Sequence, residues 1–137
     1  MSGGTGLLLA TVLLAAAGGG WLEQSKDLPL PPLPEDAPTL VEAENMFGEM
    51  VEALEAGDRR ALVNMTLSTR RHFIPDPLPP VGPEIVRQLV ACRILRPLFV
   101  IKDQQILYFQ YCEAAGERME TLFILQRDHD GKWRIKL

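Results

Sequence analysis

The amino-acid sequence predicts an α+β domain in which three helices pack on a curved antiparallel sheet of about four strands. Residues 39–57 space their apolar side chains like a helix between a capping signal and a glycine, and two more helical segments follow. Residues 97–137 hold four segments rich in aromatic and branched side chains, joined by turns too short for parallel crossovers. We therefore divide the chain into an apolar segment (1–22), a linker (23–38) and a folded domain (39–137).

The apolar segment contains no charged side chain. At about 1.5 Å per helical residue it would span roughly 30 Å, which is enough for a membrane anchor. The run from Leu7 to Ala17 also matches the apolar core and cleavage region of a secretory signal, although no Lys or Arg precedes it. A buried core helix is the third alternative. The anchor interpretation uses the following residues: Leu7, Leu8, Leu9, Val12, Leu13, Leu14 and the interfacial Trp21.

One proline cluster precedes the predicted helices and another separates the second helix from the third. "DLPLPPLPEDAP" at 27–38 contains five prolines, so we expect an extended spacer that holds the domain away from whatever precedes it. "IPDPLPPVGP" at 74–83 contains five more. Because proline continues neither a helix nor a central strand, this second cluster is predicted to be a stiff surface loop, with a lid as the functional alternative.

The first helix follows Thr39, which forms a capping box with Glu42, and stops at Gly57. Its apolar positions form one stripe: Leu40, Ala43, Phe47, Met50, Val51 and Leu54. The next residue, Asp58, is expected to cap a second, shorter helix.

The second helix is predicted to turn its apolar residues inward and to carry arginines near both ends. The inward residues are Leu62, Val63, Met65 and Thr66, and the arginines are Arg59, Arg60, Arg70 and Arg71. A third helix follows Gly82 and begins with Pro83 and Glu84, which are favoured in a first turn. The apolar spacing predicts that it runs through Ile94 towards Pro97.

The remaining chain is predicted to form strands. The segments are "PLFVI", "QILYFQYCE", "METLFILQ" and "KWRIKL". In the last one, Trp133, Ile135 and Leu137 alternate with basic residues, which indicates one buried and one solvated face. The middle segments are apolar on both faces.

Two segments resemble the nuclear transport factor two-like superfamily of cone-shaped α+β domains, and the similarity covers about residues 38–137. They are "FGEMVEALEAGDRRALV", a helix that breaks into a shorter one, and "RDHDGKWRIKL", a closing hairpin. The resemblance implies a bent sheet around the first helix, with a pocket at the open end. The superfamily includes isomerases, dehydratases, ligand binders and assembly modules, so the fold does not select a function. The proline cluster at 74–83 replaces a strand of that family, and the family's catalytic groups have no match here.

Three residues are candidates for ligand binding. His72 follows the second helix beside Phe73, where a base at a pocket mouth could lie, and a surface or capping role is the alternative. Tyr108 and Tyr111 lie three residues apart on one strand, so they face opposite sides and at most one can face a cone. Packing is the alternative for both tyrosines.

The two cysteines, Cys92 on the third helix and Cys112 on the second strand, could form a disulfide in an oxidising compartment or remain as two buried thiols. The two histidines and two cysteines show no metal-ligand spacing, so neither a metal site nor a cofactor is predicted. A net charge of -4 makes nucleic acid an unlikely partner.

These observations favour a non-enzymatic, exported module that is tethered to a membrane and serves as an accessory subunit or protein-binding domain of a membrane-associated complex. The domain would lie on the periplasmic, lumenal or extracellular side, or be secreted if residues 1–17 are removed. The alternative is a binder of a small apolar ligand, or an isomerase- or dehydratase-like enzyme that uses the cone's pocket. A homodimer through the sheet is a further expectation.

Overall fold

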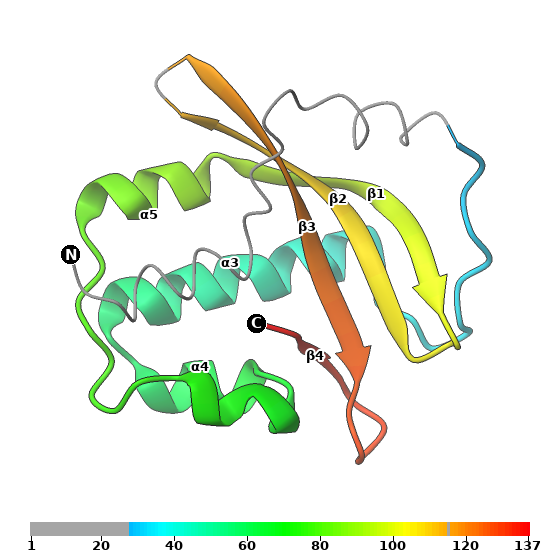
Figure 1. The fold of residues 1–137 in the computed structure, drawn as a ribbon, viewed down its shortest axis with the longest axis horizontal. Helices are drawn as coiled ribbons and strands as arrows, with labels where there is room; N and C mark the ends of the chain where they lie inside the picture. The colour runs from blue at the N-terminus through cyan, green and yellow to red at the C-terminus, as the bar shows by residue number, and fades with distance from the viewer. Residues whose placement is uncertain (1–27, 115) are drawn as a thin grey trace.

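The computed structural model describes residues 28–114 and 116–137, so the apolar segment lies outside the described residues (Figure 1). The helices are α3 (Leu40–Ala56), α4 (Arg59–Met65), the 3-10 helix η1 (Ser68–Phe73) and α5 (Pro83–Val90). The strands are β1 (Cys92–Ile101), β2 (Gln105–Ala114), β3 (Glu117–Arg127) and β4 (Trp133–Ile135). They form one antiparallel sheet in the order β1-β2-β3-β4, which confirms the predicted α+β class and strand number. None of the helices in these ranges is long and apolar enough to span a membrane.

Helix α3 begins and ends at the predicted signals. The Thr39 amide donates to Glu42 Oε1 at 2.9 Å, and the Glu42 amide donates to Thr39 Oγ1 at 3.1 Å. At the other end Gly57 adopts a left-handed conformation with φ 67°, which favours glycine. Asp58 then caps α4 by accepting from the Ala61 amide at 3.1 Å.

Helix α4 is shorter than the sequence predicts. It ends at Met65, and the expected arginines at its far end, Arg70 and Arg71, lie in η1 instead. Thr66 is fully buried and extended, and it forms a parallel bridge with Ile135 of β4. The next amide, of Leu67, donates to the Ile135 carbonyl at 2.8 Å. Pairing with β4 therefore holds Thr66 in an extended conformation and hydrogen-bonds Leu67 to the strand, although the local apolar spacing predicts a helix here.

The predicted extent of the third helix is wrong, because α5 ends at Val90 and Cys92 and Ile94 belong to β1. The first four residues of β1 alternate between buried and exposed, as strand residues do, and the first three pair with residues of β2. Pro97 lies inside this strand instead of stopping a helix. β1 is an edge strand, where a missing amide donor is tolerated.

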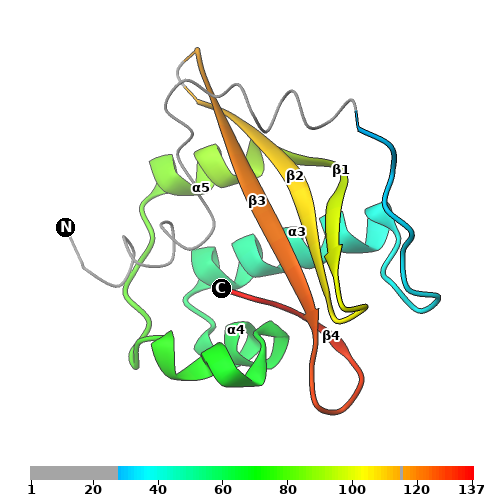
Figure 2. The ribbon, with the colours of Figure 1, turned by 45° about the vertical axis from the view of Figure 1, so that its right-hand side comes forward.

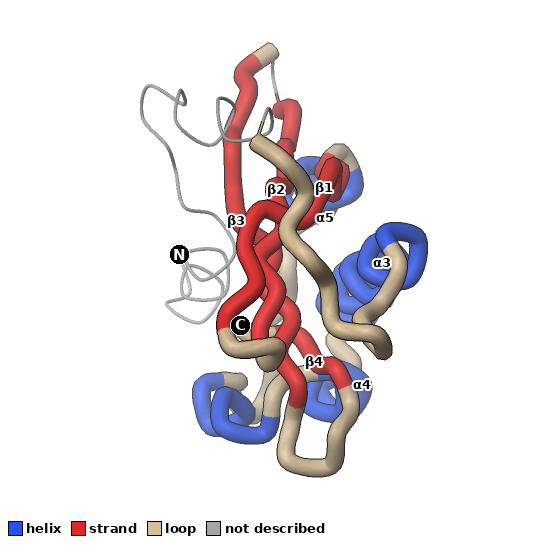
Figure 3. Tube along the Cα trace, turned by 90° about the vertical axis from the view of Figure 1, so that its right-hand side faces the viewer, coloured by secondary structure: helices blue, strands red, loops and turns tan. Residues whose placement is uncertain are grey.

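The helices and the sheet form two layers. Figure 3 shows α3 and α5 on the same side of the sheet, and Figure 2 shows α4 below α3 and close to β4. The main core lies between these layers, where the rings of Phe47 and Phe123 meet edge to face at 5.6 Å. A second apolar cluster occupies the opposite face of the sheet: Leu98, Phe109 and Leu122, with Leu107 and Ile124. The middle strands are therefore apolar on both faces, as predicted.

The described part of the linker contacts the domain. The Leu28 carbonyl accepts from Arg96 Nη1 at 2.6 Å. Asp36 forms an ion pair with Arg127, whose guanidinium stacks on the Trp133 ring at 4.7 Å from its centroid. The hydrogen bond from Arg127 lowers the pKa of the Asp36 carboxyl. The end of the predicted spacer thus packs against the sheet before α3 begins.

Candidate functional site

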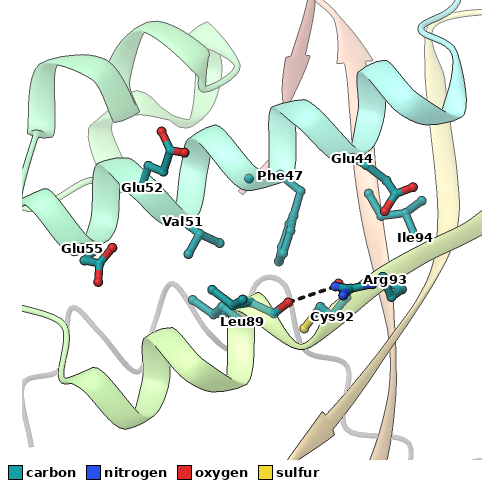
Figure 4. Close-up of a pocket in the computed structure, with 11 residues that line it drawn as sticks. Glu44, Phe47, Val51, Glu52, Glu55, Leu89, Cys92, Arg93 and Ile94 are labelled. Atoms are coloured by element: carbon teal, nitrogen blue, oxygen red, sulfur yellow. Dashed lines mark hydrogen bonds between the residues drawn. The ribbon is translucent and has the colours of Figure 1, made fainter.

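A groove of about 260 Å³ lies between α3 and the junction of α5 with β1, and we call it the α3–α5 groove (Figure 4). Four buried apolar side chains form its floor: Phe47 and Val51 of α3, Leu89 of α5 and Ile94 of β1. Figure 4 shows Phe47 pointing from α3 towards Leu89 across the groove. Three exposed glutamates of α3 border it: Glu44, Glu52 and Glu55. The result is an apolar depression with an acidic border.

The open border of the groove favours side chains of another protein over an enclosed small molecule. Pockets that bury drug-sized ligands usually hold about 300 to 1,000 Å³. The groove is close to the lower end of that range, but it is bordered by exposed residues, among them Val90, which is 59% exposed. A few apolar side chains of a partner could fill it without being surrounded.

The charges on α3 are arranged unfavourably for an isolated helix. The helix contains five glutamates and no Lys or Arg. Glu55 lies in the last turn, where the negative end of the helix dipole disfavours an acid. Glu52 precedes it by three residues, so two like charges are neighbours on the helix surface. Both residues border the groove.

Gly48 is a further departure from helix preferences at the same place. It lies in the interior of α3, four residues from both Glu44 and Glu52, and it lines the groove. Glycine in a helix interior costs about 0.5–1 kcal/mol relative to alanine. A Cβ at this position would meet no heavy atom within 4 Å, so packing within the described chain does not require glycine. Local conflicts of this kind are typical of functional surfaces.

Arg93 is the one cationic side chain among the described residues that line the groove. Its Nη1 donates to the carbonyls of Val90 at 3.0 Å and Cys92 at 2.9 Å. These bonds satisfy carbonyls at the end of α5 and place a cation at the negative end of its dipole. The Arg93 guanidinium is therefore held by hydrogen bonds to the backbone where α5 meets β1.

Cys92, which lines the groove, is joined to Cys112 by a disulfide. They are opposite residues of β1 and β2, with Cα atoms 4.0 Å apart, and not a helix–strand pair as the sequence suggested. The bond fixes the first residue of β1 to β2, an inner strand of the sheet. It thereby holds the wall that carries Arg93 and Ile94.

The structure does not bring together the three ligand-binding candidates. His72 is exposed on η1 and stacks on Phe73 with ring centroids 4.0 Å apart. Tyr108 is 1% exposed in the main core. Tyr111 faces the opposite side of the sheet, beneath the Arg118 guanidinium at 4.5 Å. None of the three lines the α3–α5 groove, and their proposed role in ligand binding stays a prediction.

The Tyr108 hydroxyl provides a test of that prediction. It is buried without a hydrogen-bond partner among the described residues, and burial, aided by the charge of Glu42, raises its pKa to about 12. An unsatisfied buried hydroxyl is destabilising, so we expect Tyr108→Phe to raise the free energy of unfolding by about 1 kcal/mol in urea titrations. A loss of stability would instead show that the hydroxyl has a partner, such as a bound ligand or water.

Ser68, Asp128 and His129 form a cluster that sequence reasoning missed, because Ser68 and Asp128 are 60 residues apart. The residue types are those of a hydrolase triad, but the geometry differs. Ser68 Oγ donates to Asp128 Oδ1 at 2.6 Å, and His129 Nδ1 lies 3.0 Å from the same oxygen. A triad histidine would accept the serine proton on one nitrogen and contact the aspartate through the other. Here the Ser68 hydroxyl donates its hydrogen bond to the Asp128 carboxylate and not to His129. The cluster therefore connects η1 to the β3–β4 turn.

The described ranges contain no group of three or more His, Cys, Asp or Glu residues that could hold a metal ion. No protein-family model matches the chain, and no curated protein or solved structure shows significant similarity to it.

Proposed function

We propose that the chain is a non-enzymatic protein-binding module, exported and tethered to a membrane by residues 1–22, that serves as an accessory subunit of a membrane-associated complex. The observation that carries the binding role is the α3–α5 groove, whose solvent-exposed rim combines Gly48 with more acids than cations above an apolar floor. The tether rests on the uncharged sequence of the apolar segment.

The same proposal includes a cone-shaped domain similar to the nuclear transport factor two-like superfamily. Three features support it: α3 breaks at Gly57 and Asp58 into the short α4, both α3 and α5 cover one face of the sheet, and β3 and β4 form a closing hairpin. Such cones include assembly modules as well as enzymes, so the groove and not the fold supports the binding role.

A matched pair of substitutions at Gly48 tests the groove. Gly48→Met extends a flexible apolar side chain into it, whereas Gly48→Ala adds one methyl group in open space. Methionine and alanine both have a higher helix propensity than glycine, so we expect both variants to fold. Gly48→Ala should be more stable than wild type by about 0.5–1 kcal/mol. The full chain is expressed with an affinity tag in the organism that naturally makes it and is extracted from membranes in mild detergent. The proteins that co-purify with each variant are then quantified.

We expect wild type and Gly48→Ala to retain the same partners and Gly48→Met to lose most of them. Equal recovery with all three proteins would contradict the groove as the binding site. The intact mass of the purified chain tests the tether separately. A full-length mass in the membrane fraction supports it, and a soluble product that begins near Gly18 would contradict it.

A further inference from the structure

We infer that the α3–α5 groove takes a basic amphipathic helix of a partner protein, with apolar side chains on the face that meets the groove and Lys or Arg beside them. This inference rests on the proposed function and adds the chemistry of the partner. Three properties of the groove lead to it: the apolar floor, the distribution of charge along α3, and the gap at Gly48.

The floor requires apolar side chains from the partner. Phe47 and Leu89 face each other across the groove, and Val51 and Ile94 complete it (Figure 4). The four floor side chains are only 3–6% exposed, so the apolar surface that leaves water on binding comes mainly from Val90, which is 59% exposed, and from the partner's own apolar side chains.

The charges require cations beside those apolar side chains. Glu44 and Glu55 lie at the two ends of the groove, and Glu52 also lines it, although Figure 4 shows its carboxylate directed away from α5. Arg93, at the same site, donates to two backbone carbonyls and keeps its positive charge, so the residues that line the groove carry an excess of two negative charges. This net negative charge would repel an acidic or phosphorylated segment and attract a basic one.

The spacing of these charges indicates a helix. Glu44 and Glu55 are eleven residues apart on α3, which corresponds to about 16 Å, or three helical turns. A partner helix lying along α3 could place cations at both ends and apolar residues between them. Gly48 lies between the acids without a side chain, so a second helix can approach the backbone of α3 closely at this point.

The experiment measures binding of two designed peptides to the full chain in phosphatidylcholine nanodiscs, with empty nanodiscs as the background. Both peptides have about 18 residues and identical leucine positions that form one helical face, and their polar positions are all Lys in one and all Glu in the other. We expect the Leu/Lys peptide to bind, to weaken as salt is added, and to bind at least tenfold more tightly than the Leu/Glu peptide.

The variant Glu44→Gln/Glu52→Gln/Glu55→Gln should bind the Leu/Lys peptide about tenfold more weakly, since each exposed charge pair contributes a fraction of a kcal/mol. The matched control Glu35→Gln/Glu113→Gln/Glu117→Gln removes three exposed acids that do not line the groove and should bind like wild type. Equal binding by both triple variants, or equal binding of both peptides, would overturn the inference.

The outcomes separate this inference from the proposed function. If Gly48→Met loses its native partners while the two triple variants bind the Leu/Lys peptide equally, the groove binds proteins but not through its acids. If wild type self-associates in sedimentation and Gly48→Met does not, the occupant is a second copy of this chain and the inference is wrong. If Gly48→Met keeps its native partners, the proposed function itself fails.

Discussion

Replacing both cysteines, as Cys92→Ala/Cys112→Ala, should lower the free energy of unfolding by about 3 kcal/mol. The disulfide closes a loop with a sequence separation of 20 residues, and a cross-link over this length removes roughly that much conformational freedom from the unfolded chain. Alanine is the appropriate replacement because both cysteines are buried, and a serine hydroxyl there would add the cost of an unsatisfied polar group.

Removing the disulfide should also weaken binding at the α3–α5 groove. Cys92 is the first residue of β1, and β1 is an edge strand whose only sheet partner in the described chain is β2. Without the disulfide, the start of this strand is held by backbone pairing and by the packing of Ile94. Because Arg93 and Ile94 form one wall of the groove, we expect the double variant to bind the Leu/Lys peptide more weakly as well as to unfold more easily.

Urea unfolding with and without reductant measures the effect. Reduced wild-type protein should unfold at nearly the same urea concentration as the double variant, and reductant should not change the variant. A wild-type protein whose transition is unaffected by complete reduction, checked by thiol counting, would show that the cross-link contributes nothing to stability.

The parts of the fold that the sequence predicts are those specified by short-range chemistry. The capping box at Thr39 and Glu42, the glycine stop at Gly57 and the Asp58 cap each depend on residues within one or two turns. The tight turn at Lys102 and Asp103, both with positive φ, joins β1 and β2 where the sequence placed a hairpin. In each of these signals, residues close in the sequence satisfy the backbone hydrogen bonds or adopt the backbone conformation that the cap or turn requires.

The errors arise where a distant segment decides the structure. Cys92 and Ile94 continue the apolar spacing of α5, and a short apolar segment of this kind fits a helix or a strand equally well. Pairing with Cys112 and Gln110 of β2 selects the strand. In the same way Thr66 leaves α4 because Ile135, near the end of the chain, offers a β-bridge.

The groove could be predicted only in part. The acids and the glycine of α3 are visible in the sequence at helical spacing, from Glu44 through Gly48 to Glu55. What the sequence does not show is that this side of α3 meets α5 and the start of β1, since the boundary between those two elements was misplaced. Without that boundary, Arg93 and Ile94 were assigned to the wrong element and the groove had no second wall.

The substitution Asp128→Asn should lower the free energy of unfolding by about 2 kcal/mol at about pH 7. Asp128 is 7% exposed and accepts hydrogen bonds from the amide and hydroxyl of Ser68, from the His129 amide and from Arg134. Bonds to a charged acceptor are worth about 1.5–3 kcal/mol, and asparagine removes the charge while keeping the shape. Arg134 retains Asp130 as a partner, so the loss arises mainly at the contact between η1 and the β3–β4 turn.

The stabilising effect of Asp128 should depend on pH, and the pKa of its carboxyl sets the direction of that dependence. Burial raises the pKa of Asp128, but the hydrogen bonds from Ser68 and His129 outweigh burial and hold the pKa well below its usual value of 3.8. A carboxyl with a depressed folded-state pKa stabilises the fold above its unfolded pKa and loses that contribution as the pH falls. Urea titrations should therefore show wild-type stability falling below about pH 4 more steeply than that of Asp128→Asn. Asp76→Asn, at an exposed position of the proline cluster, is the matched control and should follow wild type. Parallel pH profiles for wild type and Asp128→Asn would mean that the carboxylate does not hold η1 to the sheet.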